Sequence, residues 1–262
     1  SNMNAIRLYV CTMIHLYWDE KWKYGTKSSI YAKHTFYDNG ENDKTSFSEM
    51  FLECLNAVRL NLDELPKYYS YCFVMQHPKN RIVAHISECG LYLISMYSIV
   101  NNNVIEVFNE KDSIFGSTKV RMPKRYNIGS YDEIEKVISG VVVLKDINMN
   151  YESVGLMIKS GVNRCKLRNA KYEYVKRLKG NQPKLMYQYL QLKKDQKIKE
   201  YLYYFPEVKD KFDKYDERMR EFIQRLYQYY VNCFIFKEKE LSEYPYEFRN
   251  HLYVLHSHYL NH

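Results

Sequence analysis

The sequence predicts an α+β protein in which an antiparallel-sheet body is followed by an all-helical C-terminal region. Up to about residue 168, short runs rich in β-branched and aromatic residues follow one another with few helices between them, which is typical of antiparallel pairing. Beyond that point apolar residues recur at spacings of three and four, which indicates helices. Pro183 and Pro206 are the candidate boundaries between structural regions in the sequence. We therefore expect domains at residues 3–182 and 183–262 of this 262-residue chain.

The first part of the body is predicted to be a strand pair and a helix. Residues 6–18 and 21–26 are rich in β-forming side chains and meet at a polar turn near Asp19-Glu20. Ser46 and Glu49 have the spacing of a capping box, in which two side chains cap the amino end of a helix. The apolar residues that follow share one helical face. They are Met50, Phe51, Cys54, Leu55 and Val58.

Further strands complete the predicted body. Breaks at Pro78-Lys79-Asn80 and at Gly90 separate three of them, and Ser160-Gly161 separates the last two. A short helix at 132–137 leads into the most apolar run of the chain. The expected strands are 69–75, 81–88, 91–99, 140–145, 154–159 and 163–167.

The rest of the chain is predicted to be helical. The longest helix carries a single apolar face, made of Met219, Phe222, Ile223, Leu226, Tyr230 and Cys233. The expected helices are 171–179, 183–192, 195–204, 208–236 and 244–260.

Composition excludes disordered and membrane-spanning classes. The chain is 46% hydrophobic and 27% charged, and its longest apolar runs, such as 140–144, are far too short to cross a membrane. No cleavable signal precedes the first strand. Six cysteines are scattered without the spacing of metal ligands, at positions 11, 54, 72, 89, 165 and 233. These features predict a cytoplasmic, reducing location in which the thiols are buried side chains and form neither disulfides nor a zinc knuckle.

Positive charge is concentrated in one stretch. The net charge is +8, yet residues 164–200 alone hold twelve Lys and Arg against three acidic residues, a net of +9. Tyrosines at 172, 174, 187 and 189 interleave these cations. A basic, aromatic-rich stretch is typical of proteins that bind a phosphate backbone, and it predicts RNA or another nucleic acid as a partner. The alternative is a solvated helix face whose lysine stems cover apolar surface.

Three segments in fixed order resemble the later motifs of the covalent nucleotidyltransferases, the superfamily of RNA ligases, DNA ligases and mRNA capping enzymes. They are residues 71–83, which contain His-Pro-Lys-Asn-Arg-Ile-Val, then 139–146 and 164–169. The first segment most resembles RNA-ligase-like proteins of phages and large DNA viruses. The resemblance covers about residues 8–180, and it implies that the body is an antiparallel-sheet nucleotidyltransferase domain, similar to the ATP-grasp-like ligase fold.

The motif that carries the nucleophile of this family lacks its lysine here. In the family, the lysine of Lys-x-Asp-Gly-Ser/Thr attacks the α-phosphate of ATP or GTP. The matching segment begins at Leu8, and Val10-Cys11 replaces Asp-Gly. The hairpin that follows ends near Lys27 and resembles the turn after this motif in the ligases. The resemblance therefore implies a role for Lys27 in binding RNA, but no catalytic residue.

In the next two motifs, uncharged residues replace the acidic residues of the family. The family places an aromatic residue on the nucleotide base and an acid after it; here these positions are Phe73 and Val74, with Tyr71 on the same face of the strand. The alternative is that Tyr71 and Phe73 are aromatic residues of the hydrophobic core. The turn residues His77, Asn80 and Arg81 are expected to be exposed and to contact RNA. The Glu-Gly pair that assists the metal becomes Ser139-Gly140, with Lys145 at the end of that strand as a phosphate ligand.

The last motif, usually Lys-x-Lys, is kept as Lys166-x-Arg168, with Arg164 before it. Alternation places all three cations on one face of a strand, an arrangement that suits phosphate. The following helix adds cations that we expect to contact RNA, namely Lys171, Lys176 and Arg177.

We therefore interpret the chain as an RNA-ligase-like protein of the nucleotidyltransferase fold, catalytically degenerate, that binds RNA or nucleotide phosphates in a basic groove. One alternative is an active ligase or capping-type enzyme, using ATP and Mg²⁺, whose lysine is displaced or trimmed. Another is an interaction module whose helical C-terminal region holds a protein partner. The C-terminal histidines at 251, 256, 258 and 262 do not share one helical face, so no metal site is expected there.

Overall fold

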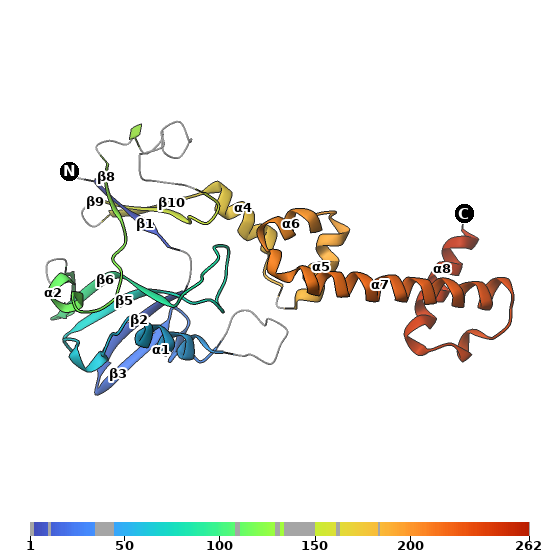
Figure 1. Ribbon diagram of the computed structural model, residues 1–262, viewed down its shortest axis with the longest axis horizontal. Helices are drawn as coiled ribbons and strands as arrows, with labels where there is room; N and C mark the ends of the chain where they lie inside the picture. The colour runs from blue at the N-terminus through green and yellow to red at the C-terminus, as the bar shows by residue number, and fades with distance from the viewer. Residues whose placement is uncertain are drawn as a thin grey trace. The chain divides into compact units, whose positions relative to one another are not determined.

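The computed structural model divides the chain into two compact units, Ser1–Leu185 and Met186–His262, which we call the sheet unit and the helical unit (Figure 1). The predicted division at residue 182 lies close to this boundary. Among the helices that the structure describes, none is both long and apolar enough to cross a membrane. The described residues are 3–9, 12–34, 45–107, 111–128, 132–133, 150–160, 163–182 and 184–261.

The larger sheet of the sheet unit has six strands in the order β4-β3-β2-β5-β6-β7. All neighbouring pairs are antiparallel, as the sequence predicts. The strands are β2 (Thr12–Asp19), β3 (Lys21–Thr26), β4 (Ser29–Ile30), β5 (Tyr69–Gln76), β6 (Gly90–Val100) and β7 (Asn103–Glu106).

Helix α1 (Phe47–Ala57) covers one face of this sheet. The predicted capping box is confirmed, because the Ser46 amide donates to Glu49 Oε2 at 2.6 Å and the Glu49 amide donates to Ser46 Oγ at 3.2 Å. The predicted apolar face of α1 is buried against side chains of β2, β5 and β6. Each large apolar side chain buried here contributes roughly 1.5–3 kcal/mol to folding.

The smaller sheet has four strands in the order β10-β9-β1-β8, also antiparallel. Its strands are β1 (Met3–Leu8), β8 (Arg125–Ile128), β9 (Gly155–Ser160) and β10 (Asn163–Arg168). Short segments complete the sheet unit: η1 (Leu62–Glu64), α2 (Lys111–Phe115) and α4 (Ala170–Lys179).

Two strand predictions are wrong. The single strand expected at 6–18 is two strands, because β1 pairs with β8 and β9 whereas β2 pairs with β3 and β5 in the other sheet. Residues 81–88 form no strand, since both edges of β5 are occupied by β2 and β6. Most of the expected helix 132–137 and all of the strand 140–145 lie outside the described residues.

Gly155 allows β9 to begin directly against β10. Its φ of +138° is a backbone conformation that side-chain-bearing residues rarely adopt. A Cβ atom at this position would lie 1.9 Å from the carbonyl oxygen of Leu167 on β10. The close approach of the two strands therefore depends on the absence of a side chain here.

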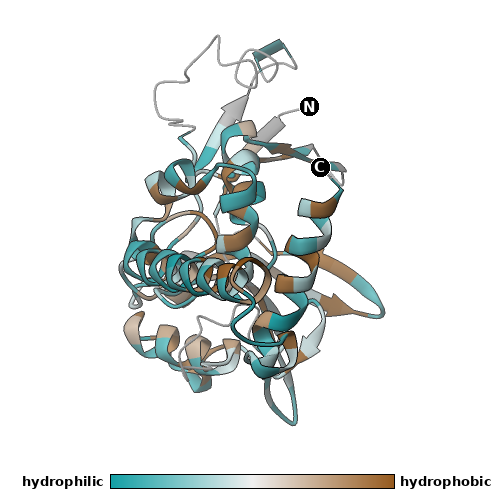
Figure 2. Ribbon diagram, turned by 90° about the vertical axis from the view of Figure 1, so that its right-hand side faces the viewer, coloured by the Kyte–Doolittle hydropathy of each residue, from teal (hydrophilic) through white to brown (hydrophobic). Residues whose placement is uncertain are grey.

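The predicted helices of the helical unit are confirmed. They are α5 (Leu185–Lys194), α6 (Ile198–Tyr204), α7 (Lys209–Tyr230) and α8 (Tyr246–Leu260), with short segments η2 (Pro206–Val208), η3 (Val231–Ile235) and η4 (Leu241–Glu243). Much of α7 is hydrophilic (Figure 2). From the predicted apolar face of the longest helix, Phe222, Leu226 and Tyr230 pack near buried Phe248 and Leu252 of α8, whereas Ile223 is exposed.

A polar network joins α5 to α7 within the helical unit. The Tyr189 hydroxyl and the Lys193 ammonium both donate to Asp216 Oδ1, the former at 2.7 Å. Arg220 Nε donates to Asp216 Oδ2 at 2.7 Å. Lys193 above all, and then Tyr189 and Arg220, hold the pKa of the Asp216 carboxyl well below its usual range.

We expect Gly155→Ala to destabilise the protein by about 3 kcal/mol, because the new Cβ forces β9 and β10 apart and leaves the backbone strained. A thermal melt followed by circular dichroism measures the change. Gly90→Ala is the matched control, since a Cβ there meets the Arg121 side chain at an ordinary 3.7 Å. Equal melting temperatures for the two variants would contradict the steric account.

We expect Asp216→Asn to lower the melting temperature at neutral pH and to lose this effect in acid. A carboxyl whose pKa is lowered by folding stabilises the protein above its unfolded-state pKa, about 3.9, and this contribution disappears as pH falls through the lower folded-state pKa. Melts between neutral and acidic pH give the difference. Asp213→Asn, which breaks an exposed pair with Lys209, should change little at any pH.

Candidate functional site

A cleft of about 1150 Å³ lies between the two sheets of the sheet unit. One wall is formed by β1, β9 and β10 of the smaller sheet. The other wall is the face of β2, β5 and β6 that α1 leaves uncovered. Helix α4 contributes Tyr172, Glu173 and Lys176 to the lining. The cleft is thus bounded by elements that are far apart in the sequence.

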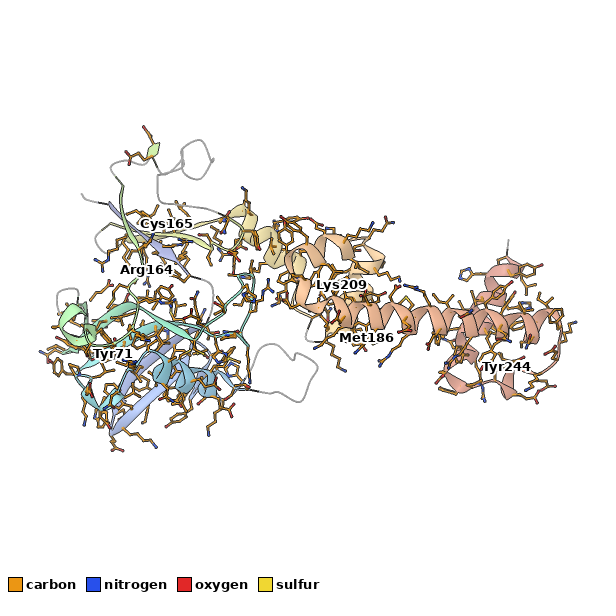
Figure 3. The ribbon with its side chains drawn as sticks, in the orientation of Figure 1. Tyr71, Arg164, Cys165, Met186, Lys209 and Tyr244 are labelled. Atoms are coloured by element: carbon orange, nitrogen blue, oxygen red, sulfur yellow. The ribbon has the colours of Figure 1, made fainter. Side chains whose placement is uncertain are left out.

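The wall formed by the smaller sheet is cationic. Arg164, Lys166 and Arg168 alternate along β10 and all line the cleft, as the sequence predicts for one face of a strand. Figure 3 shows Arg164 on the side of β10 that faces the larger sheet and Cys165 on the other side. Arg168 pairs with Glu173 at 3.2 Å, whereas Arg164 and Lys166 form no ion pair with any described residue.

Lys159 is a further cation of this wall that the sequence analysis missed. It lies on β9 directly opposite Arg164 of β10. Its Nζ donates to both carboxylate oxygens of Glu106 on β7, at 2.9 and 3.1 Å, so this ion pair joins the two sheets. The sequence indicates Lys159 only as the last residue of an alternating strand pattern. Its partner could not be predicted from the sequence, because Glu106 is 53 residues away.

The opposite wall is mainly apolar and aromatic. Most of its lining from β2 and β5 comes from side chains that point away from the core under α1, and the buried residues Leu16 and Tyr71 also border the cleft. His15 Nδ1 and Cys72 Sγ lie 3.1 Å apart on this wall. Burial raises the pKa of the Cys72 thiol to about 11, so it stays protonated at neutral pH and is a poor nucleophile. The lining includes Met13, His15, Tyr17, Cys72, Val74, Ser95, Tyr97 and Ile99.

The aromatic pair proposed for base stacking lies in the core instead. Tyr71 and Phe73 are both 0% exposed and belong to the cluster under α1. The Tyr71 hydroxyl donates to the Pro66 carbonyl at 2.8 Å, and both rings pack edge-on against Phe115. Because Phe73 is one residue out of phase with Cys72 and Val74, its ring points to the opposite face from the cleft. This placement fits the core alternative: Tyr71 borders the cleft but has no exposed ring surface, and Phe73 does not line the cleft.

Two positions where the nucleotidyltransferase family carries charge line the cleft as apolar residues. Leu8, aligned with the nucleophilic lysine, ends β1 at the cleft. Val74, aligned with the acid, lies on the opposite wall. The expected hairpin is present as β3 and β4, with Lys27 exposed in its turn. Val10, Cys11, Ser139 and Lys145 lie outside the described residues.

The turn after β5 is not the exposed polar surface that the sequence predicts. His77 is 2% exposed and Asn80 is 4% exposed. His77 Nε2 lies 2.9 Å from Glu53 Oε2, and Asn80 Nδ2 donates to Thr12 Oγ1 at 2.9 Å. Arg81 is half-buried and donates from Nε to the Val83 carbonyl. The expectation of exposure is therefore wrong, because these polar groups are used to fasten the turn to α1 and β2.

The cations of α4 are exposed, as an RNA-binding role requires. Lys171, Lys176 and Arg177 all have solvent-accessible side chains. Asn169 fixes the start of this helix: its side chain accepts from the Lys171 amide and donates to the carbonyls of Asn150 and Ser153. The helix is thereby held beside the start of β9 and next to the cationic wall.

The described lining suits an anion better than a metal ion. A nucleotide or RNA phosphate would meet the β10 cations, whose donors match phosphate oxygens. Among the described residues, Glu173 is the one carboxylate of the lining, and it is paired with Arg168. Mg²⁺ is usually held by one or two carboxylates together with substrate phosphates. The described residues therefore do not fit a carboxylate-bound Mg²⁺ site in this cleft.

Comparison with known proteins finds similarity to RNA ligases. The chain is 27% identical over 166 residues to an RNA ligase of Rhodothermus phage RM378, a match that covers 55% of this chain and 37% of the ligase. An archaeal ATP-dependent RNA ligase structure is similar with a TM-score of 0.40 and 12% identity, covering 84% of this chain and 56% of that one. No family model matches the chain.

The predicted resemblance to RNA-ligase-like nucleotidyltransferases is confirmed by the phage relative. The predicted fold class is confirmed as well, since antiparallel sheets are followed by a helical region. The chain spans less than two thirds of the length of either ligase, and only 37% of the phage one.

Proposed function

We propose that this chain is an RNA-ligase-like protein of the nucleotidyltransferase fold that binds RNA through its phosphates in the cleft between the two sheets and forms no covalent nucleotide adduct. The observation that carries the proposal is the pairing of two unlike walls. Cations of β9 and β10 face an apolar and aromatic wall of β2, β5 and β6 across about 1150 Å³.

Phosphate binding is supported by the charge balance of β10. Like charges on one face of a strand repel one another unless an anion or water lies between them. Glu106 neutralises Lys159 and Glu173 neutralises Arg168, which leaves Arg164 and Lys166 without a carboxylate partner among the described residues. A phosphate group would meet both charges at once, through charge-assisted hydrogen bonds.

Binding of RNA in preference to a free nucleotide is supported by the length of the basic surface. Arg164 and Lys166 lead along β10 to α4, where Lys171, Lys176 and Arg177 continue the exposed cations. A mononucleotide offers its phosphates at one point, whereas an RNA strand presents a phosphate at every nucleotide. Aromatic side chains of the opposite wall, such as Tyr17 and Tyr97, supply surfaces on which bases stack in other RNA-binding proteins.

The absence of an adduct is supported by the residues that line the cleft in place of charged ones. Leu8 cannot act as a nucleophile, and Val74 cannot carry the charge of an acid. The family's Glu-Gly pair aligns with Ser139-Gly140, so its carboxylate is missing. Another pair that ends in glycine, Val154-Gly155 at the start of β9, has no carboxylate either. Losing three charges of one reaction is harder to reconcile with activity than losing one.

The protein-interaction alternative keeps one specific observation in its favour. In the helical unit, α8 exposes large apolar side chains, which include Tyr246, Tyr253, Val254, Leu255, Tyr259 and Leu260. A protein partner would bury such groups. Failure of the chain to bind RNA would favour this alternative over the proposed function.

We expect Lys166→Ala to weaken binding of single-stranded RNA by about 1–3 kcal/mol, the range of hydrogen bonds to charged groups. The slope of log affinity against log salt should become shallower by about 0.7, because one phosphate fewer is neutralised. Fluorescence anisotropy at several salt concentrations measures both, and the melting temperature should hardly change.

Lys21→Ala is the matched control, since Lys21 is an exposed lysine on β3 that does not line the cleft. It should leave affinity and slope as they are. Equal losses for the two variants would mean that the protein attracts RNA through its net charge and not through the cleft.

We expect no covalent adduct after incubation with ATP or GTP and Mg²⁺ or Mn²⁺. Intact-mass spectrometry of the denatured protein detects a transferred nucleotide. An adduct on Lys159 or Lys166 would instead support the active-ligase alternative with a displaced nucleophile.

A further inference from the structure

Three metal-ligating side chains converge on the other side of the larger sheet, beside α1, and a fourth, Cys54, is next to this cluster. Glu53 and Cys54 belong to α1, His77 follows β5 and Cys89 precedes β6. One ligand atom from each of Glu53, His77 and Cys89 lies within 4.8 Å of the others. Cys54 lies close enough to Cys89 for each thiol to influence the pKa of the other. Residues separated by as many as 36 positions are thus brought to one point by the fold.

We propose that Cys54, His77 and Cys89, with Glu53 as the fourth ligand, form a structural Zn²⁺ site. The inference is independent of the proposed function, because α1 packs on the sheet face opposite the cleft.

The chemical types of the ligand atoms favour Zn²⁺ over other metal ions. Two thiolates, an imidazole and a carboxylate are the ligand types that Zn²⁺ takes in four-coordinate sites, whereas Mg²⁺ and Ca²⁺ need oxygen ligands. Tetrahedral Zn²⁺ bonds of about 2.0–2.3 Å hold ligand atoms roughly 3.3–3.8 Å apart. The separations of up to 4.8 Å therefore have to shorten by about 1 Å at most for the three groups to share one ion.

One backbone contact favours a thiolate at Cys54, and burial opposes it. The Gly90 amide donates to Cys54 Sγ, a contact that stabilises the negative sulfur. Burial raises the pKa of the Cys54 thiol to about 12, and it raises the pKa of the Cys89 thiol as well. Binding of Zn²⁺ therefore releases one proton from each cysteine to solvent, and the site with its carboxylate then carries a net charge of −1.

His77 is placed to ligate through Nε2. This atom lies 2.9 Å from Glu53 Oε2, and Nδ1 accepts from the Lys79 amide at 3.2 Å. With Nδ1 accepting a hydrogen bond, Nε2 is the ring nitrogen that carries hydrogen toward Glu53. A metal at Nε2 moves that proton to Nδ1, so the Lys79 amide must turn away when the ion binds. Lys79 lies in a turn and its side chain is exposed, which leaves room for this movement.

The expected effect of the ion is to fasten α1 to the ends of β5 and β6. Cys54 already contacts this region, since its thiol donates to the Gln76 carbonyl at 3.3 Å. A Zn²⁺ ion would replace these weak contacts by four coordinate bonds between three segments. Ions that bind only the folded state raise its melting temperature.

The test uses the full chain, stripped of metal with a chelator and kept reduced. Titration with Co²⁺ should produce a thiolate-to-cobalt charge-transfer band that saturates at one ion per chain and is abolished by added Zn²⁺. The thiolate band distinguishes this site from the C-terminal histidines, which have no sulfur. In ¹H–¹⁵N spectra, the Lys79 amide should shift on addition of Zn²⁺.

Two variants and one control accompany the titration. Cys89→Ser should abolish the thiolate band or shift it strongly, and Glu53→Gln, at a half-exposed position, should weaken Zn²⁺ binding at least about tenfold. Cys165→Ser removes an exposed thiol outside the cluster and should bind as the unaltered chain does.

The proposal is overturned if the reduced chain gives no thiolate band. It is also overturned if Cys89→Ser and Glu53→Gln, both folded by circular dichroism, bind Zn²⁺ as tightly as Cys165→Ser. Recovery of a disulfide-linked Cys54–Cys89 peptide from reduced, metal-saturated protein would likewise reject it.

Discussion

The packing of α1 against one face of the six-stranded sheet determines where the rest of the sheet unit can lie. Because side chains alternate along a strand, burying Tyr71 and Phe73 under α1 turns Cys72 and Val74 to the other face. That face is only partly covered by the smaller sheet, and the space left over is the cleft. A change of register by one residue in β5 would exchange the core and the cleft lining.

Electrostatics connects the two sheets across this space. The Lys159–Glu106 ion pair, with both side chains about one-fifth exposed, joins β9 to β7. Breaking such a half-buried pair leaves a charge with reduced hydration, so the pair favours one arrangement of the sheets. The same wall keeps Arg164 and Lys166 without carboxylate partners among the described residues. The β9–β10 wall therefore combines two cations that are paired with carboxylates, Lys159 and Arg168, with two that are available to an anion.

The two faces of the larger sheet have different chemistry. The cleft face presents apolar and aromatic side chains opposite the cations of the smaller sheet, and we propose that RNA phosphates bind between them. The core face ends in a cluster of thiol, imidazole and carboxylate groups, and we assign it to Zn²⁺. Cys72, on the cleft side, has its thiol pKa raised by burial, as Cys54 does on the core side. Of the two, Cys54 has neighbours that could form a metal site with it.

Local patterns in the sequence were sufficient to predict the α+β class, the capping box at Ser46 and the cation alternation of β10, because each depends on residues a few positions apart. They could not predict which face of β5 is buried, since alternation identifies two faces without saying what packs on either. Tyr71 and Phe73 were assigned to the cleft for that reason, and His77 and Asn80 to the surface. The partners of Lys159 and the meeting of Cys54, His77 and Cys89 were decided only by the tertiary structure, because strand pairing and helix packing bring together side chains that no short sequence interval connects.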